Sequence, residues 1–334
     1  MAVKIAINGF GRIGRMALRQ MFGTADYEIA AINDLTTPRV LAHLLKYDSS
    51  QGRYNRRVEA SENGIFVDGV FVAAYAERDP KFLPWKSLGI DIVLECTGLF
   101  TSRAKSASHI EAGAKKVVIS APGGSDIPTI VFGVNERNLR ADDLIISSGS
   151  CTTNCLALIA NELNRLAPIK KGFMTTIHAY TNDQQALDGP HHFGDLRRSR
   201  SAAGNIVPTM TGAARVIGDV IPALAGKLDG TSQRVPVMTG SLVELTAVVE
   251  GKIDSEKINA AMKNAASDSL GYTEDEIVSS DIIGILYGSL FDATQTKTSE
   301  MGDCTLVKVA AWYDNEASHT AQMLRITKFF ASIT

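Results

Sequence analysis

The sequence predicts an α/β protein with two domains: one built on a doubly wound, mostly parallel sheet, and an α+β domain with a mostly antiparallel sheet. The chain has 334 residues, more than the ~250–300 residues that one hydrophobic core usually serves. Its first 150 residues alternate short apolar strand patterns with helix patterns, which favours parallel strands covered by helices. Later strand patterns are longer. We expect one domain over 1–150 with 316–334, and the other over 151–315.

The expected elements of the first domain alternate between strands and helices. Apolar runs predict strands at 4–8, 28–33, 91–96, 116–120, 129–134 and 144–147. Apolar residues at helical spacing predict helices at 12–22, 38–47 and 102–112. The pattern across 64–72, with Asp68–Gly69 in its middle, predicts a hairpin.

The second domain is expected to begin with a helix and continue with longer strands. Helix patterns cover 151–166, 254–267 and 316–330, and strand patterns cover 172–180, 234–237, 241–250 and 304–312. We expect the last helix to pack back onto the first domain. The segment 182–208 has little periodicity, and loops of that length in compact domains are usually functional.

Composition excludes several classes of protein. The net charge of −2 at pH 7 provides no basic surface for nucleic acid as a main role. No apolar run approaches the ~20 residues of a membrane helix, and the start of the sequence does not resemble a signal peptide. Four cysteines are too few for a disulfide framework, so we expect free thiols, a cytoplasmic protein and no metal site. Cys96 and Cys304 lie in apolar runs and are expected to be inert.

A glycine-rich segment near the N-terminus indicates a Rossmann dinucleotide site. Residues 9–14 read GFGRIG, follow an expected strand and open an expected helix. Gly9 permits the tight turn, Gly11 lets a pyrophosphate approach the backbone, and Gly14 allows close helix packing. Asp34 ends the next strand, where a carboxylate can bind the adenosine ribose and repel a 2′-phosphate. This pattern favours NAD over NADP; the alternative is a glycine turn that binds nothing.

A cysteine at a helix start is the candidate nucleophile. Ser150 is an expected N-cap, which puts Cys151 in the first helical turn, where the helix end lowers a thiol pKa. Cys155, one turn deeper, is expected to be buried and structural. His178 ends a predicted strand beside the long loop and is the candidate base. The alternative for His178 is a hydrogen-bonded core histidine.

Anion sites are expected at helix starts and arginines. Thr211 is an expected cap of the helix that begins near Gly212, and Ser150 and Thr152 flank the thiol at another helix start. Arg234 opens a predicted strand and can add positive charge. The arginines at 197–200 lie in the long loop, where solvent exposure is as plausible as a contact to phosphate.

Together these segments resemble the phosphorylating, NAD-linked glyceraldehyde-3-phosphate dehydrogenase family, and the resemblance runs essentially end to end. The segments that carry it are INGFGRIGR at 7–15, IND at 32–34, ERDP at 77–80, SCTTNC at 150–155, HAYTNDQ at 178–184, TGAA at 211–214 and WYDNE at 312–316. The cysteine segment is the most specific of these. The family's proteins are usually homotetramers, and the resemblance places the loop near 182–201 at a subunit contact.

The resemblance implies a role for each matching residue. Cys151 would be the nucleophile and His178 its activating base. The residues implied in NAD binding are Gly9, Gly11, Arg12, Ile13, Gly14, Asp34, Arg78, Ser120 and Asn315. One phosphate would be held by Thr181, Arg198 and Arg234, and the other by Ser150, Thr152, Thr211 and Gly212.

Four positions depart from the family pattern. Gly149, Leu158, Met210 and His319 stand where Ala, Pro, a small hydroxyl residue and Tyr are usual. His319 is the departure that matters, because the usual tyrosine lies near the nicotinamide and a histidine adds a titrating group there. It leaves Cys151 and His178 in place, so we expect it to affect the rate more than the reaction.

The expected reaction is oxidation of glyceraldehyde 3-phosphate to 1,3-bisphosphoglycerate, through a thioester on Cys151 that inorganic phosphate cleaves. One alternative is an erythrose-4-phosphate dehydrogenase, in which water hydrolyses the thioester. Another is a non-catalytic binding or adhesion protein of the same fold. That class predicts loss of Cys151, His178 or Asp34, and all three are present.

Overall fold

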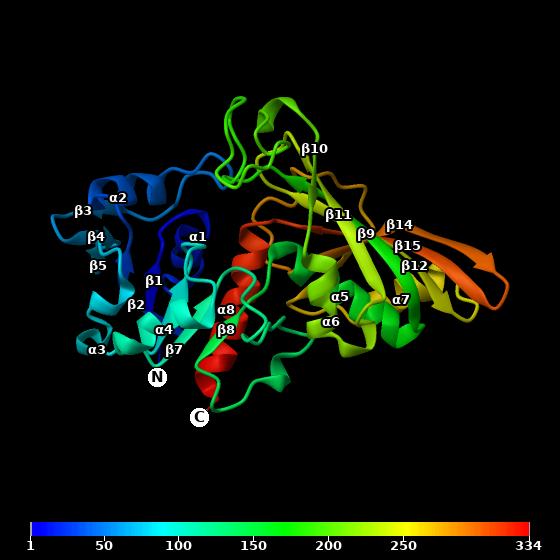
Figure 1. The fold of residues 1–334 in the computed structure, drawn as a ribbon, viewed down its shortest axis with the longest axis horizontal. Coiled ribbons are helices and arrows are strands. Elements are labelled where there is room, and N and C mark those ends of the chain that lie inside the picture. Colours follow the sequence, from blue (N-terminus) through cyan, green and yellow to red (C-terminus); the bar gives the residue numbers. More distant parts are fainter. Residues whose placement is uncertain (1, 334) are drawn as a thin grey trace. The chain divides into compact units, whose positions relative to one another are not determined.

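The computed structural model describes residues 2–333, which divide by their internal contacts into two units (Figure 1). The first unit holds the residues up to Gly149 together with those from Thr320 onward, and the second holds Ser150–His319. In the described part of the chain, no helix combines the length and the apolar character that a bilayer span needs.

The first unit is built on an eight-stranded sheet in the order β3-β4-β5-β2-β1-β6-β7-β8. Its parallel strands are β1 (Val3–Asn8), β2 (Tyr27–Asn33), β6 (Ile92–Glu95), β7 (Lys116–Ile119) and β8 (Ile145–Ser147). The strands β3 (Val58–Ala60), β4 (Gly64–Val67) and β5 (Val70–Tyr75) form the antiparallel pairs β3–β4 and β4–β5, and β5 joins β2 in parallel. The predicted hairpin is confirmed: its turn residues Asp68 and Gly69 adopt φ angles of 47° and 83°.

Helices cover both faces of this sheet. They are α1 (Arg12–Met21), α2 (Pro38–Lys46), α3 (Trp85–Leu88), α4 (Arg103–Glu111) and α8 (Ala317–Ser332), with short 3₁₀ helices at Pro80–Phe82 and Glu136–Asn138. Because alternate residues of a strand face opposite sides, Ile5 and Ile7 pack in the core with α1, α2 and α8. Ala6 packs in the other core, with Trp85 of α3.

The last helix packs against the first unit, as the sequence predicts. Met323 and Phe330 of α8 are fully buried in the core that contains Ile5 and Ile7. The hydroxyl of Tyr27 donates a hydrogen bond of 2.7 Å to the carbonyl of Leu324. These contacts make a segment from the far end of the sequence part of the first unit's core.

The predicted strand at 129–134 is wrong. Only a single bridge forms there, between Thr129 and Ser147, and the chain then turns. The side-chain oxygen of Asn135 accepts the N–H of Val131 at 2.7 Å, and Gly133 takes a φ of 86°. This local side-chain bond replaces the ladder hydrogen bond that a strand would need.

The second unit is a seven-stranded sheet in the order β10-β11-β9-β12-β15-β14-β13. The strands are β9 (Ile169–Ala179), β10 (Val207–Met210), β11 (Leu228–Val235), β12 (Ser241–Glu250), β13 (Leu270–Thr273), β14 (Ser289–Met301) and β15 (Cys304–Tyr313). Neighbours are antiparallel except for the β9–β11 and β13–β14 pairs, so the predicted mostly antiparallel sheet is confirmed. The strand predicted at 234–237 begins earlier, at Leu228, because its polar first half pairs with β9.

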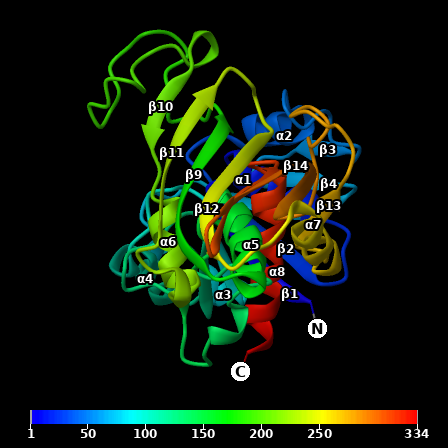
Figure 2. The ribbon, with the colours of Figure 1, turned by 90° about the vertical axis from the view of Figure 1, so that its right-hand side faces the viewer.

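Helices of the second unit are α5 (Cys151–Leu166), α6 (Ala213–Val220) and α7 (Ser255–Asn264), with 3₁₀ helices at Ala202–Gly204 and Pro222–Leu224. The apolar face of α5 packs on β12, β14 and β15, and Figure 2 shows β11, β9 and β12 side by side with α5 against them. This packing fixes the first turn of α5 relative to the end of β9.

Candidate active site

The reactive thiol sits at the start of α5. Ser150 is the N-cap, as predicted, and its hydroxyl accepts the N–H of Thr153 at 3.0 Å. Cys151 Sγ then lies 3.3 Å from Nε2 of His178, which is held on β9 near its end. The structure therefore brings the predicted nucleophile and base into hydrogen-bond distance.

The pKa of Cys151 differs from the sequence prediction. Burial raises the pKa of the thiol, against a smaller lowering by the positive charge of Arg234 and by hydrogen bonds from Thr152. Burial also lowers the pKa of His178 to about 3, and the charge of Arg234 adds to that effect. Both shifts favour the neutral thiol and the neutral imidazole over the charged forms.

His178 is fixed by three neighbours. Its Nδ1 lies 2.6 Å from the carbonyl oxygen of Ala179 and 2.8 Å from Nη1 of Arg234. Arg234 faces His178 across the parallel β9–β11 pair, so strand register alone puts the two side chains together. The ring of Tyr313 meets the imidazole edge-on, with centroids 5.9 Å apart.

Tyr313 is a site residue that sequence reasoning missed. Its buried hydroxyl lies 2.9 Å from Oγ1 of Thr152 and 2.7 Å from Oγ1 of Thr176. It therefore links the first turn of α5 to β9 and supports the geometry of the thiol and imidazole. The sequence signal that could have identified it is a tyrosine at the end of a mostly apolar strand, because a buried tyrosine hydroxyl usually has a hydrogen-bond partner.

A cluster of charged side chains lies next to His178. Nη1 of Arg234 donates to Oγ1 of Thr181 at 3.1 Å, and Nη1 of Arg198 pairs with Asp183 at 2.6 Å. Thr181 also donates a hydrogen bond to Asp183. Burial raises the pKa of Asp183, but the bond from Thr181 and the charges of Arg234 and Arg198 outweigh it and lower the pKa overall. The cluster thus joins three predicted phosphate ligands and one carboxylate, Asp183, that sequence reasoning missed.

The cluster contains a hydrogen-bond donor that an anion could use. Nε of Arg234 is buried and has no hydrogen-bond partner among the residues that the structure describes. A buried guanidinium donor without a partner costs free energy, which an anionic ligand would recover.

The remaining predicted phosphate ligands lie at helix starts. Thr211 precedes α6, and its hydroxyl oxygen accepts the N–H of Ala213 at 3.2 Å. The N-cap of α6 is Gly212, one residue after the predicted cap Thr211. Ser150 and Thr152 occupy the start of α5. Backbone N–H groups and the dipoles at both helix starts favour a negative ligand.

The glycine-rich turn of the first unit packs too closely against backbone for side chains at two of its glycines. Gly9 adopts a φ of 91°, and a Cβ there would lie 2.6 Å from the backbone nitrogen of Thr97. A Cβ on Gly14 would lie 2.1 Å from the carbonyl oxygen of Gly9. Gly11 faces open space and caps α1 without a side-chain hydrogen bond. The space beside Gly11 is therefore open next to the start of α1, where backbone N–H groups favour a negative ligand.

Several predicted cofactor ligands line one pocket beside this turn. Its lining includes Gly9, Gly11, Asp34, Arg78, Thr97 and Leu99. The carboxylate of Asp34 accepts the N–H of Phe10 at 2.8 Å, which ties it to the glycine-rich turn. Thr97 was missed, because a threonine after a strand carries no distinctive sequence signal.

The other predicted cofactor residues lie on α1, directly after β7 and shortly after β15. Ile13 lies in the first turn of α1, and the guanidinium of Arg12 pairs with Asp48 at 2.5 Å. Ser120 follows β7, and its N–H donates to the carbonyl of Glu95 at 3.0 Å. Asn315 lies in the second unit, where its side-chain oxygen accepts from Thr239 at 3.1 Å.

Two further sequence expectations concern cysteines and metals. All four cysteines are free, and Cys155 is buried with Sγ 3.4 Å from the hydroxyl of Ser289. Within residues 2–333 no group of three or more His, Cys, Asp or Glu side chains is arranged to hold a metal ion. His319 is buried in α8.

Comparisons with known proteins agree with this geometry. Residues 3–103 match the NAD binding domain of glyceraldehyde 3-phosphate dehydrogenase, and residues 150–315 match its C-terminal domain. Relatives named glyceraldehyde-3-phosphate dehydrogenase are 60% identical in Clostridium acetobutylicum and 59% in Clostridium pasteurianum, each over 99% of both chains. One from Streptococcus pyogenes is 56% identical over 100% of this chain and 99% of its own. The chain therefore belongs to the glyceraldehyde-3-phosphate dehydrogenase family, and its first unit carries that family's NAD-binding domain.

Proposed function

We propose that the protein oxidises glyceraldehyde 3-phosphate to 1,3-bisphosphoglycerate with NAD and inorganic phosphate. The observation that carries this proposal is the 3.3 Å contact between Cys151 Sγ and His178 Nε2, beside a cluster of arginines. A thiol with a neutral base suits attack on an aldehyde, and arginines suit a phosphorylated substrate.

The first step forms a bond between Cys151 sulfur and the aldehyde carbon. The thiol proton passes through His178 Nε2 to the former carbonyl oxygen, which gives a hemithioacetal. This role requires the tautomer in which Nδ1–H donates to the carbonyl of Ala179, 2.6 Å away, so that Nε2 is free to accept. In that tautomer Nη1 of Arg234, 2.8 Å from the same Nδ1, directs its two hydrogens to the carbonyl of Ala179 and to Oγ1 of Thr181 instead. The backbone N–H of Cys151 and the imidazole stabilise the developing oxyanion.

The second step oxidises the hemithioacetal. His178 accepts the hydroxyl proton, the C–O double bond forms, and a thioester remains on Cys151. NAD, when bound, supplies the acceptor for the hydride at C4 of its nicotinamide. Inorganic phosphate then attacks the thioester carbon, the C–S bond breaks, and the imidazolium returns its proton to the sulfur.

Two anion sites serve this sequence. We assign one phosphate to Thr181, Arg198 and Arg234, and the other to Ser150, Thr152, Thr211 and Gly212. The buried, unpartnered Nε of Arg234 supports the first assignment. The helix starts of α5 and α6 support the second. Binding of the remote phosphate orients the carbonyl for attack.

NAD would be held by the glycine-rich turn and the pocket beside it. The assigned residues are Gly9, Gly11, Arg12, Ile13, Gly14, Asp34, Arg78, Ser120 and Asn315. Asp34 would accept the ribose hydroxyls and repel the 2′-phosphate of NADP. We also propose that the protein is a homotetramer, as is usual in the family. We propose a cytoplasmic location, which the four free thiols support.

The deciding experiment follows NADH absorbance with glyceraldehyde 3-phosphate, with and without inorganic phosphate. The proposal expects turnover only when phosphate is present. Equal turnover without phosphate, or a preference for erythrose 4-phosphate, would indicate the hydrolytic alternative. No NADH with either aldehyde would indicate a non-catalytic protein. Light scattering after size-exclusion chromatography tests the tetramer.

A further inference from the structure

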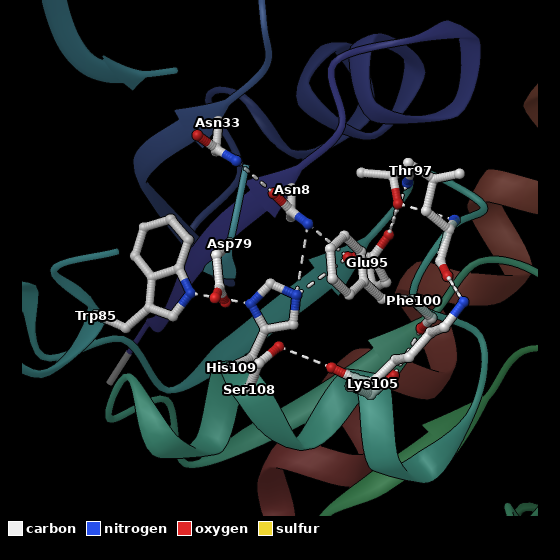
Figure 3. Close-up of polar contacts among 12 residues, drawn as sticks. Asn8, Asn33, Asp79, Trp85, Glu95, Thr97, Phe100, Lys105, Ser108 and His109 are labelled. Carbon is white, nitrogen blue, oxygen red and sulfur yellow. Dashed lines mark hydrogen bonds and ion pairs between the residues drawn. The ribbon is translucent and has the colours of Figure 1, made fainter. Parts of the chain in front are cut away.

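A chain of buried polar side chains lies beneath the NAD pocket of the first unit. Figure 3 shows Asn33, Asn8, Glu95, His109 and Trp85 in continuous contact. Each is at most 4% exposed, so water does not satisfy its polar atoms. The proposed catalytic steps use none of these five side chains.

The hydrogen bonds fix the charge of each member. The indole Nε1–H of Trp85 is only a donor, and it lies 3.1 Å from Nδ1 of His109. Nδ1 must therefore accept, which leaves the proton of a neutral His109 on Nε2. That Nε2–H donates to Glu95 at 3.0 Å, and the amide nitrogen of Asn8, 3.4 Å from the same Nε2, donates to Glu95 rather than to His109.

Glu95 receives donors at both oxygens. One oxygen accepts from His109 and from the amide of Asn8, at 3.0 and 2.6 Å. The other accepts the N–H and the hydroxyl of Thr97, at 2.7 and 2.5 Å. The two oxygens together face four donor groups, an arrangement that an ionised, acceptor-only carboxylate satisfies in full.

The chain of contacts ends on the segments that line the pocket. Thr97, held by Glu95, accepts the N–H of Leu99 at 3.0 Å, which shapes the loop after β6. The amide of Asn33 donates to Asn8 and to the carbonyl of Glu77, and its oxygen accepts the N–H of Glu77 at 2.9 Å. Asn8, Asn33, Glu77, Thr97 and Leu99 all line the pocket, whereas Glu95, His109 and Trp85 do not.

We propose that Glu95 is a positioning residue for NAD binding, with its charge maintained by His109 and Trp85. Through Asn8, Asn33 and Thr97, its carboxylate sets the relative positions of the loops that follow β1, β2 and β6. The proposal rests on the family's NAD-binding domain and is independent of the reaction proposed above.

Glu95→Gln tests this directly because it keeps the shape and removes the charge. A glutamine that still accepts from Thr97 presents an NH₂ group to the donors of Asn8 and His109. His109 could accept a hydrogen bond from this NH₂ group only in its other tautomer. That tautomer would place the Nδ1–H of His109 against the indole N–H of Trp85. We expect the dissociation constant for NAD, measured calorimetrically without substrate, to rise about tenfold to a hundredfold, as for loss of hydrogen bonds to a charged group.

Trp85→Phe provides the second variant and a coupling measurement. It removes one N–H from a residue that does not line the pocket, and we expect NAD affinity to fall about threefold, within the range of coupled neighbours. Because it also frees Nδ1 of His109, the Glu95→Gln/Trp85→Phe double variant should bind NAD more tightly than the sum of the single effects predicts. An additive result would overturn the role given to Trp85.

Val117→Ala is the matched control, since Val117 is fully buried in the same core as Trp85 and does not line the pocket. It should lower thermal stability and leave the NAD dissociation constant unchanged. In Glu95→Gln, KM for NAD should rise while kcat at saturating NAD and KM for the aldehyde stay unchanged. If Glu95→Gln loses stability like Val117→Ala but binds NAD normally, Glu95 is only structural and the proposal fails. If Glu95→Gln does not fold, the Trp85→Phe variant decides: an unchanged NAD dissociation constant in that variant rejects the proposal.

Discussion

Nε2 of His178 lies 3.3 Å from Sγ of Cys151, although the two residues are 27 positions apart in the sequence. The contact depends on α5 beginning at Cys151 and on β9 ending just beyond His178. Burial raises the pKa of Cys151 and lowers that of His178, which favours the neutral forms of both, and the 3.3 Å contact arranges the pair for proton transfer during attack.

Replacing the sulfur should separate binding from chemistry. We expect Cys151→Ser to bind NAD normally and to show neither turnover nor a burst of acyl-enzyme, because a serine hydroxyl is a far weaker nucleophile beside the same base. Rapid-mixing absorbance measures the burst. Cys155→Ala, in which the buried neighbouring thiol is removed, is the control and should retain the burst. Normal turnover by Cys151→Ser would refute the thioester mechanism.

Removing the base should change how the rate depends on pH. We expect His178→Asn to lower kcat/KM by ~10²–10⁴, the usual contribution of a general base. Without the base, attack needs a preformed thiolate, and burial raises the pKa of Cys151. The residual rate should therefore increase with pH through the alkaline range, whereas the wild type should vary less. If kcat/KM of His178→Asn and of the wild type depend on pH in the same way, His178 does not act as the base.

His178 should also make the fold less stable in acid. Its pKa falls from an ordinary value near 6.5 to about 3 in the folded state. Between those values the unfolded chain binds a proton that the native state does not, so stability decreases as pH falls. Urea titrations at several pH values measure this slope, which we expect to be smaller in His178→Asn. An unchanged slope would show that His178 is protonated in the native state.

Arg234 should contribute both to substrate binding and to the charge of His178. We expect Arg234→Leu to raise KM for glyceraldehyde 3-phosphate about tenfold to a hundredfold, because it removes charge-assisted hydrogen bonds. Loss of its positive charge should also raise the pKa of His178, which ¹⁵N resonances of the imidazole would report. Arg234→Lys is the control: it should restore the charge effect but only part of the binding. A KM unaffected in both variants would remove Arg234 from the phosphate site.

Asp34 should determine the choice of cofactor. We expect Asp34→Asn to weaken NAD binding and to narrow the preference for NAD over NADP, since the repelling charge is gone. The variant retains an oxygen that can accept the N–H of Phe10, which Asp34 binds at 2.8 Å, so the turn should persist. Steady-state kinetics with each cofactor provide the ratio. An unchanged ratio would assign the selectivity to another group.

Local patterns were sufficient to predict much of the site. The glycine spacing at 9–14 reflects backbone constraints, and such constraints are visible in sequence because only glycine meets them. Ser150 as a cap and Cys151 in the first turn follow from the same local logic. The hairpin at Asp68–Gly69 does as well.

Non-local contacts could not be predicted from the sequence. Asp183 and Tyr313 join the site only because the sheet brings β9, β11 and the end of β15 together, and no periodicity encodes that pairing. The raised pKa of Cys151 also depends on tertiary packing, because burial outweighs the lowering by the charge of Arg234 and by hydrogen bonds from Thr152. The strand expected at 129–134 failed because one side chain, Asn135, takes the hydrogen bond that a strand would have used.

The packing of α8 has a consequence for synthesis of the protein. Met323, Ile326 and Phe330 occupy the core of a unit whose strands are all made before residue 150. While the chain is still on the ribosome, that core has an exposed gap until these three side chains emerge. The NAD-binding unit, although translated first, is therefore the last part of the molecule to be completed.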